Sequence, residues 1–368
     1  MIIKALKSYK RKIKISWLFR PHQAGKNQVR IYINTRPGRT GGPRVFVQKF
    51  SSVLIRQGYS VSFDCASSCA CALMLILSPG DEFFMRARRE KIRTIGRIGG
   101  FYHPLYFDKK EYRPPFQDRR LTPEKIGFNS RLKSDLGMYD HVVYQSMFTK
   151  TMCDLYLYKR EGEYSVIHNG VDTSTFYPAE NNNHPLTLIH AGTLRHEYIF
   201  NTILPVFLEL KKTIPQLRLI IAGPMDGACH LIFKEYADKY KNDFKNVEYL
   251  GAVSNDRLPG VYRRADIYLH PRQGDWSPNA IIEALASGLP VVCGKWGGQS
   301  EIIGSAGIAV DSKPWDYSQG YINGFIHAVN EITQNLNIYK SQARKLALED
   351  FNLDKMIQRY LRALGVII

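Results

Sequence analysis

The sequence has no apolar run that approaches the roughly 20 residues needed to cross a bilayer. Residues 72–77 are apolar throughout, but they have only the length of a strand. The basic opening segment, residues 1–26, lacks the continuous apolar core of a signal peptide, because charges interrupt each of its short apolar runs. Internal repeats and low-complexity tracts are also missing. We therefore expect a globular chain with neither a spanning helix nor a signal peptide.

Cysteine is scarce, with six residues spread over both halves of the 368-residue chain. Cys65, Cys69 and Cys71 cluster, but that segment has no His to complete a metal site. We interpret the three as small buried residues around a strand, with a metal site as the weaker alternative. Reduced cysteines fit a cytoplasmic compartment, where disulfides are rare.

Carboxylates are absent from the first 50 residues, and this absence polarises the chain. Residues 1–170 hold 31 Lys and Arg against 13 Asp and Glu, a balance of +18, whereas residues 171–368 hold 20 of each. The basic half faces an anionic partner, or it is merely a solvated basic face. We do not expect nucleic acid, because no basic stripe interleaved with aromatic residues is found. We favour an anionic membrane surface, which attracts basic segments by about 1 kcal/mol per Lys or Arg.

The length and the 44% hydrophobic content allow two cores, so we expect two domains. Short apolar runs alternate with amphipathic stretches, a pattern typical of parallel sheets covered by helices on both faces. A Gly-rich loop and a helix over residues 44–56 follow the first run. The expected strands cover 29–34, 60–64, 72–78, 94–98, 141–146 and 165–168, then 186–192, 217–224, 247–251, 265–270 and 289–293.

A short helix after residue 276 organises the second half. Ser277 followed by Pro278 predicts its start, since Ser caps free N–H groups and Pro suits the first helical position. Gly288 and then Pro290 predict its end. Between them, Glu283 interrupts an apolar run, and an ionised Glu there is costly unless something hydrogen-bonds it.

Glu283 has two interpretations. It is either a structural residue held by a nearby Arg or by backbone N–H groups, or a carboxylate at the floor of a cleft that accepts from ligand hydroxyls. Asp275 lies in the loop at the mouth of the helix, and Asn279 shares a helix face with Glu283. Two carboxylates seven residues apart suit a sugar nucleotide, which has polyols at both ends and phosphate between. The loops 271–275 and 294–298 and the glycines that follow three other strands also fall at carboxyl ends of strands, where such sheets bind ligands.

This stretch, an acid, seven residues, Glu283, then Ala-Leu-Ala-Ser-Gly-Leu-Pro-Val-Val and Gly-Gly-x-x-Glu, resembles the donor-site motif of family-4 retaining glycosyltransferases of the GT-B fold. Residues 166–178, with Asn-Gly-Val-Asp and Phe-Tyr-Pro, resemble the interdomain signature of the same family. The resemblance runs from about Gly41 to the C-terminus. It implies an acceptor-side Rossmann-like domain over 1–174, a nucleotide-sugar-binding Rossmann-like domain over 175–350, and a helix over 351–368 that crosses back to the N-terminal domain.

The resemblance also implies roles for side chains. Glu283 would hold the ribose hydroxyls of a nucleotide-diphosphate sugar, and Asp275 the hydroxyls of the transferred sugar, which passes with retention to a glycan or lipid-linked acceptor. No Asp-x-Asp occurs, so we expect neither metal nor cofactor, and phosphate charge met by helix dipoles and basic side chains. The remaining donor-binding candidates are Gly41, Gly42, Asn279, Gly297 and Gly298.

The sequence departs from the family at two places. Thr193 and Tyr198 stand where the family usually has the Arg and Lys that contact the diphosphate, which makes Arg195 or Lys295 the candidate substitutes. Near the acceptor cleft, Gly99 replaces an Asp that some members carry, and His103 is the nearest titratable residue. Two alternatives therefore stay open: a non-catalytic relative that binds glycan or serves as a partner subunit, and a sugar-nucleotide epimerase of the same fold.

Overall fold

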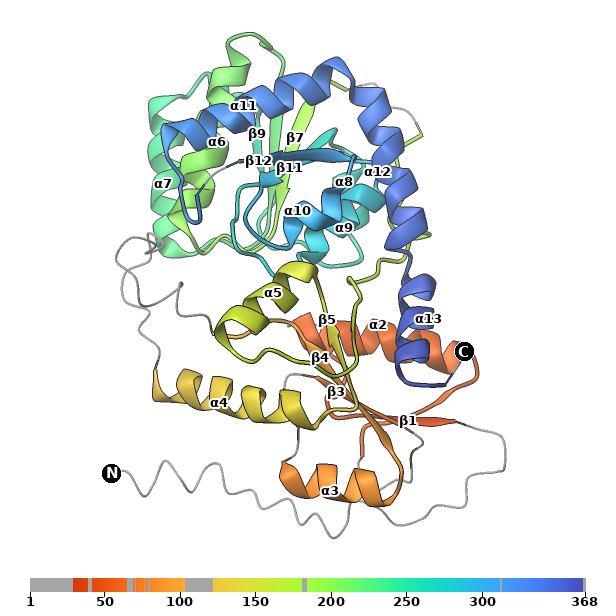
Figure 1. The fold of residues 1–368 in the computed structure, drawn as a ribbon. Helices are drawn as coiled ribbons and strands as arrows, with labels where there is room; N and C mark the ends of the chain where they lie inside the picture. The colour runs from red at the N-terminus through yellow and green to blue at the C-terminus, as the bar shows by residue number, and fades with distance from the viewer. Residues whose placement is uncertain are drawn as a thin grey trace.

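The computed structural model describes residues 29–366 except 39–41, 65–68, 70, 76, 79, 103–121, 181–183 and 312. The basic segment 1–26 and the candidates Gly41 and His103 lie outside the described residues, as does Cys65. The described chain forms two sheets of six parallel strands, each covered by helices on both faces (Figure 1).

The N-terminal sheet has the strand order β2-β1-β3-β4-β5-β6, and all its pairs are parallel. Its strands lie within three residues of the expected ranges, which confirms them. One face packs on α2 (Gly42–Arg56) and the C-terminal helix, and the other on α3 (Asp81–Arg89), α4 (Pro123–Met138) and α5 (Met147–Tyr156). The strands are β1 (Arg30–Ile33), β2 (Ser60–Ser62), β3 (Cys71–Leu75), β4 (Arg93–Ile98), β5 (His141–Tyr144) and β6 (Tyr164–Val166).

The C-terminal sheet has the order β12-β11-β10-β7-β8-β9, again parallel throughout. Strands β7, β10 and β11 are buried along their whole length, as expected for apolar strands covered on both faces. Five of the six strands were expected from the sequence and one, β12, was not. The strands are β7 (Thr187–Ala191), β8 (Arg218–Ala222), β9 (Val247–Tyr249), β10 (Ile267–His270), β11 (Val291–Gly294) and β12 (Gly307–Val310).

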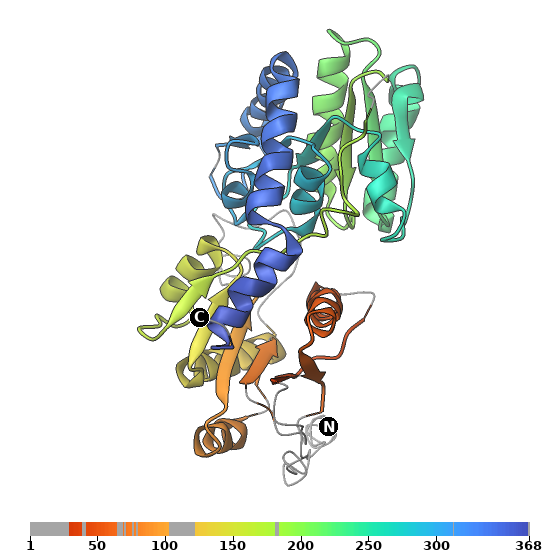
Figure 2. The ribbon, with the colours of Figure 1, turned by 90° about the vertical axis from the view of Figure 1, so that its right-hand side faces the viewer.

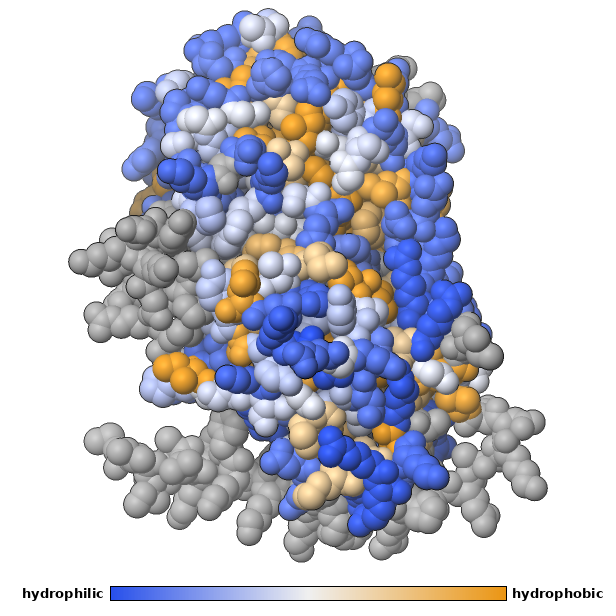
Figure 3. All heavy atoms as spheres, viewed as in Figure 1, coloured by the Kyte–Doolittle hydropathy of each residue, from blue (hydrophilic) through white to orange (hydrophobic). Residues whose placement is uncertain are grey.

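Two helix layers enclose this second sheet. One consists of α6 (Glu197–Lys211), α7 (Gly227–Lys239) and α11 (Gln319–Gln334), and a short 3-10 helix η4 (Asp243–Asn246) precedes β9. The other consists of α8 (Leu258–Tyr262), α9 (Asn279–Ala286), α10 (Gln299–Ile303) and α12 (Leu336–Asp350). Figure 3 shows hydrophilic residues over most of one face of the molecule, including the outer side of α12.

The C-terminal helix returns to the N-terminal domain as expected, over Leu353–Ala363 rather than 351–368, and a break separates it from the preceding helix α12. Helix α12 packs on α9, and a separate α13 (Leu353–Ala363) packs on α2. Figure 2 shows the chain continuing from α12 into α13, in blue, beside the N-terminal domain. The break has a local cause, because the Asn352 side chain accepts hydrogen bonds from the N–H groups of Asp354 and Lys355 and so begins a new helix. Asn352 also bridges to Val171, so both interdomain crossings run side by side. None of the helices in the described ranges is long and apolar enough to cross a membrane.

Candidate functional site

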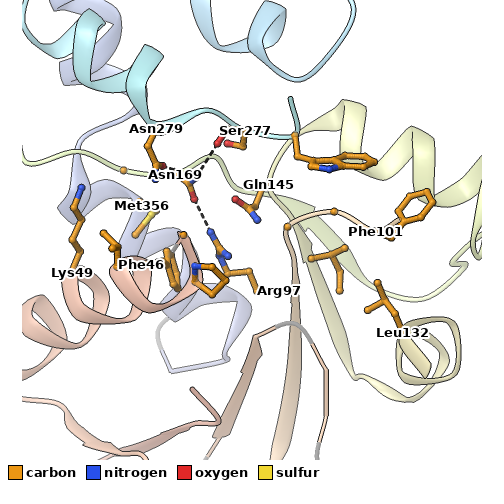
Figure 4. Close-up of a pocket in the computed structure, with 18 of the residues that line it drawn as sticks. Phe46, Lys49, Arg97, Phe101, Leu132, Gln145, Asn169, Ser277, Asn279 and Met356 are labelled. Atoms are coloured by element: carbon orange, nitrogen blue, oxygen red, sulfur yellow. Dashed lines mark hydrogen bonds between the residues drawn. The ribbon is translucent and has the colours of Figure 1, made fainter. Parts of the chain in front are cut away.

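A cavity of about 510 Å³ lies between the domains, at carboxyl ends of strands from the N-terminal sheet. Gly99 and Gly100 follow β4 in its wall, and Gln145 follows β5. The C-terminal domain contributes Trp276 from the loop between β10 and α9, and Ser277 and Asn279 at the start of α9. Figure 4 shows Ser277 and Asn279 beside Asn169. The cavity therefore has the position and size of a ligand site in an open α/β fold.

Helix α9 begins one residue later than the sequence predicted. Pro278 is the N-cap, in an extended conformation with ψ 117°, and the helix starts at Asn279. The Ser277 hydroxyl is buried and makes no hydrogen bond to the described residues, so the prediction that Ser277 caps this helix is wrong. The predicted end is confirmed, because Gly288 has φ +76° and a Cβ there would lie 2.9 Å from Pro178 Cγ.

Glu283 faces the N-terminal domain. Its Oε1 lies 3.8 Å from Nζ of Lys49, which projects from α2 and lines the cavity. Burial raises the pKa of the Glu283 carboxyl above its usual value, and the nearby ammonium of Lys49 opposes that rise. No Arg of the described chain pairs with Glu283. Of the structural interpretation that we considered, a Glu held by an Arg or by backbone N–H groups, the Arg is thus replaced by Lys49, and the role of Glu283 at a ligand stays a prediction.

Asp275 lies in the loop between β10 and α9, with a largely buried side chain. Its Oδ2 is 3.7 Å from Nε of Arg272 and 4.0 Å from Nε2 of His270. Burial lowers the pKa of His270 to about 3, so that ring is neutral and the ion pair is with Arg272. Both ring nitrogens of His270 are buried without a hydrogen-bond partner among the described residues, which is unusual for polar groups.

Arg272 is the basic residue nearest to the rim carboxylate. The sequence analysis placed the loop 271–275 at a ligand-binding end of the sheet but did not single out Arg272. It follows the carboxyl end of β10, and its side chain is about half exposed (51%). Its positive charge lowers the pKa of the hydroxyl of Tyr198, the residue that replaces the usual Lys, and so opposes the effect of burial. Tyr198 stacks on Tyr317 with ring centroids 4.2 Å apart, and burial raises the pKa of its hydroxyl to about 12.

The two cations proposed from the sequence lie elsewhere. Arg195 is exposed beyond the end of β7. Lys295 is exposed beyond β11 and pairs with Asp311, 3.3 Å from its Nζ. Neither residue lines the described cavity. Their roles at a donor phosphate stay predictions.

The glycine-rich loop after β11 packs against the rim. Gly298 N–H donates to the Asp275 carbonyl at 2.7 Å, so this amide joins the loop after β11 to the loop after β10. A Cβ on Gly298 would lie 2.2 Å from the Trp276 carbonyl oxygen, which explains why glycine is needed there. Gly297 directly precedes it. A direct contact of either amide with a donor stays a prediction.

Hydrogen bonds join the domains around this site. The Glu301 carboxylate of α10 accepts from the N–H groups of Met147 and Phe148, the first two residues of α5, the former at 2.7 Å. Ser146 donates from its hydroxyl to the Trp276 carbonyl at 2.7 Å. The Asn169 side-chain amide donates to Asn279 Oδ1 at 2.8 Å. The cavity is therefore closed on one side by direct bonds between both lobes.

Two glycines that the sequence analysis singled out in the N-terminal domain, Gly42 and Gly99, both line the cavity. Gly42 is the first residue of α2 and lines the cavity. Gly99 lies against Gln145, whose Nε2 would be 2.3 Å from a Cβ at that position. A side chain at Gly99 would therefore displace Gln145. Within the described ranges, no group of three or more His, Cys, Asp or Glu is placed to hold a metal ion.

Comparison with known proteins places this site in context. Residues 174–344 match the family described as Glycosyl transferases group 1. The chain is 27% identical over 179 residues to the phosphatidylinositol N-acetylglucosaminyltransferase gpi3 subunit of Schizosaccharomyces pombe, across 48% of this chain and 39% of that protein. It is 26% identical over 231 residues to the UDP-Gal:alpha-D-GlcNAc-diphosphoundecaprenol alpha-1,3-galactosyltransferase of Escherichia coli, across 57% and 56%. The matches thus span about half the length of these curated relatives or less.

A solved structure shares the whole arrangement. The Anabaena protein HepE in complex with UDP and glucose superimposes with a TM-score of 0.61 at 14% sequence identity, over 93% of this chain and 100% of that chain. At this identity the likeness shows the fold alone. The fold is GT-B, with two Rossmann-like domains that face each other and a C-terminal helix that returns to the first, as expected from the sequence.

Proposed function

We propose that the chain, whose residues 174–344 match the glycosyl transferases group 1 family, is a retaining glycosyltransferase. It transfers a sugar from a nucleotide-diphosphate donor to a hydroxyl of a glycan or lipid-linked acceptor. The names of the two relatives support this proposal, since one is named for N-acetylglucosaminyl transfer and the other for galactosyl transfer from UDP-Gal.

The position of Glu283 carries the proposal. An apolar helix presents this carboxylate towards the other domain, where a single Lys49 is its only ion-pair partner in the described chain. A buried carboxylate with so little compensation is costly to the fold and well suited to accept from the two hydroxyls of a ribose. Asp275 then holds the hydroxyls of the transferred sugar from the rim, and Asn279 lies between the two acids in sequence.

The donor diphosphate needs positive charge, which we assign to Arg272. This guanidinium lies beside Asp275 and near Tyr198, so it replaces the basic residues that the sequence lacks after β7. It presents a planar set of donors suited to phosphate oxygens. With this charge and the N–H groups of the Gly297 loop, the transfer proceeds without a metal or another cofactor, in keeping with the lack of any Asp-x-Asp.

Retention requires that the acceptor oxygen bonds to the anomeric carbon on the face that the diphosphate leaves. The acceptor proton must then pass to a nearby base. Gly99 stands where some relatives carry an Asp, so no carboxylate at this position takes the proton. The leaving phosphate oxygen is the group that receives it in our proposal.

A panel of nucleotide sugars tests the function. Binding by calorimetry and product formation are measured for wild type, Glu283→Gln and Asp275→Asn, with Glu209→Gln on the exposed side of α6 as a matched control. We expect one or a few donors to bind, both site variants to lose affinity and transfer, and excess EDTA to have no effect. Transfer that survives loss of both acids would contradict the assignment, and inhibition by EDTA would contradict metal independence.

A second candidate is a non-catalytic relative that binds glycan or assists a partner subunit. It is favoured by Thr193 and the buried Tyr198, which leave the end of β7 without the usual cations. Failure of every donor to bind would select this candidate. Donor turnover without acceptor would instead select the epimerase.

We also propose that the basic N-terminal half meets an anionic membrane surface, on the charge balance of the sequence. Vesicles of phosphatidylcholine with and without phosphatidylserine test this by sedimentation. Stronger binding to the anionic vesicles, weakened by salt, is expected. Equally weak binding to the two kinds of vesicle at low salt would contradict the proposed membrane contact.

A further inference from the structure

Arg97 is a buried cation without a buried anion to match it. It is the fifth residue of β4, and only 5% of its surface is exposed. Its Nε donates to the Tyr360 hydroxyl at 3.1 Å and its Nη2 to Asn169 Oδ1 at 2.7 Å. The guanidinium also covers the ring of Phe46, 3.9 Å from the centroid. All three partners are neutral.

No carboxylate of the described residues lies within ion-pair distance of Arg97, and burial lowers the pKa of its guanidinium. Charged side chains are rarely buried without a counter-charge, because the desolvation cost is large. The third nitrogen, Nη1, makes no hydrogen bond to any residue that the structure describes. The guanidinium therefore keeps donors for another group.

The cavity that Arg97 lines also has more positive than negative side chains. Its described wall contains two cations, Arg97 and Lys49, and no carboxylate. The first residue of α2, Gly42, also lies in this wall, so the positive end of a 15-residue helix faces the same space. Lys49 already has Glu283 within 3.8 Å, which leaves Arg97 as the cation without a partner of opposite sign.

The wall is mixed on one side and apolar on the other. Figure 4 shows the polar Lys49, Arg97, Asn169 and Asn279 together with Phe46 and Met356 on one side, and Phe101 with Leu132 on the other. Phe128 and Trp276 extend the apolar side. An occupant matched to this wall carries an anion next to an apolar group, with polar groups directed at α9.

We propose that this cavity holds the acceptor, and that Arg97 binds a phosphate group that the acceptor carries next to an apolar chain. The proposal rests on the proposed function, since it assigns the substrate class of the same cleft. Phosphate is also present in the donor, so the two sources must be told apart. Arg97 comes from the N-terminal sheet, opposite the rim carboxylate and Arg272, and this position favours the acceptor.

Geranyl diphosphate serves as the amphiphilic probe, with geraniol and inorganic pyrophosphate as its halves and with UDP and GDP as donor probes. Affinities are measured by calorimetry on the full chain. We expect geranyl diphosphate to bind wild type at least tenfold more tightly than either half. Arg97→Gln should lower that affinity at least tenfold while UDP or GDP binds within twofold of wild type, and Arg97→Lys should fall between.

Two further variants distinguish a loss of binding from a loss of folding. Gln145→Glu keeps Arg97 and adds the carboxylate that the wall lacks, so it should weaken geranyl diphosphate binding and leave geraniol binding unchanged. Arg218→Gln, on a half-buried Arg of β8 that does not line the cavity and pairs with Glu248, is the matched control and should leave the affinities for all probes unchanged. Melting temperatures report whether each variant is folded.

Three results would overturn the proposal: equal binding of geranyl diphosphate and geraniol, unchanged affinity in Arg97→Gln, or an equal loss of UDP or GDP affinity, which would assign Arg97 to the donor. Failure of the proposed function gives a different pattern. In that case no nucleotide or nucleotide sugar binds wild type, while geranyl diphosphate still binds in a manner that depends on Arg97.

Discussion

Replacing Glu283 by Gln should weaken donor binding and stabilise the fold at the same time. Hydrogen bonds to a charged group contribute about 1.5–3 kcal/mol, and Gln loses the negative charge and replaces one of the two acceptor oxygens by a donor. At about 1.4 kcal/mol per factor of ten, donor affinity should fall about tenfold to a hundredfold. The measurement is a calorimetric titration with the nucleotide sugar that wild type binds.

The effect on stability has the opposite sign. Burial raises the pKa of Glu283 in the folded chain, so its contribution to stability is present below the usual carboxyl pKa and is lost as pH rises through the raised value. Gln stays neutral, and Glu283→Gln should therefore have a higher melting temperature than wild type at neutral pH and a similar one in acid. Such a gain in stability at the expense of binding is typical of functional residues.

Replacing Lys49 tests the same carboxylate through its pKa. It opposes the rise in the pKa of Glu283, so Lys49→Gln should raise that pKa further. The pH below which wild type loses donor affinity should then move upward in Lys49→Gln and vanish in Glu283→Gln. A lower melting temperature with unchanged donor affinity in Glu283→Gln would refute the reasoning, because Glu283 would then be a structural residue.

The remaining predictions concern the rim and the contacts between domains. Arg272→Gln should weaken binding of a nucleoside diphosphate about tenfold and of the nucleoside little, and equal losses would remove Arg272 from the phosphate site. Glu301→Gln should lower the melting temperature by about 2 °C relative to Glu349→Gln, since two solvent-screened bonds across the domains are worth about 1 kcal/mol. Gly100→Ala should lower the free energy of unfolding by about 1–3 kcal/mol, because Gly100 has φ +136°. It should also shift the tryptophan fluorescence, because a Cβ would lie 2.5 Å from Trp276 Nε1, and an unchanged spectrum would count against that contact.

The sequence predicted what depends on local pattern. Eleven expected strands are present because apolar runs bounded by Gly or polar residues are a local signal. Gly288 was recognisable as a helix end for the same reason. Strand β12 was missed because Gly307–Val310 is short and follows directly on the small helix α10, so no alternation separates it. Asn352 was missed as a cap because apolar positions continue with helical spacing on both sides of it.

The site itself depends on contacts that no local pattern encodes. Lys49 meets Glu283 only because α2 and α9 face each other across the cleft, and the two residues are far apart in the chain. Arg97 falls inside the strand expected over 94–98, and its neutral partners Tyr360 and Asn169 come from elsewhere in the fold, so the sequence pattern could not show its lack of a carboxylate partner. A motif identifies which residues have chemistry, and the tertiary contacts decide what charge each one meets.

The charges at the cleft differ in how far the protein itself compensates them. Asp275 pairs with Arg272 within the C-terminal domain, and Glu283 of that domain pairs with Lys49 of the N-terminal domain. Of these charges and Arg97, only Arg97 has no partner of opposite sign among the described residues. A donor held by Asp275, Glu283 and Arg272 would leave Arg97 uncompensated, whereas an acceptor that carries phosphate would supply its counter-charge. Closure of the two domains would thereby be coupled to the presence of both substrates.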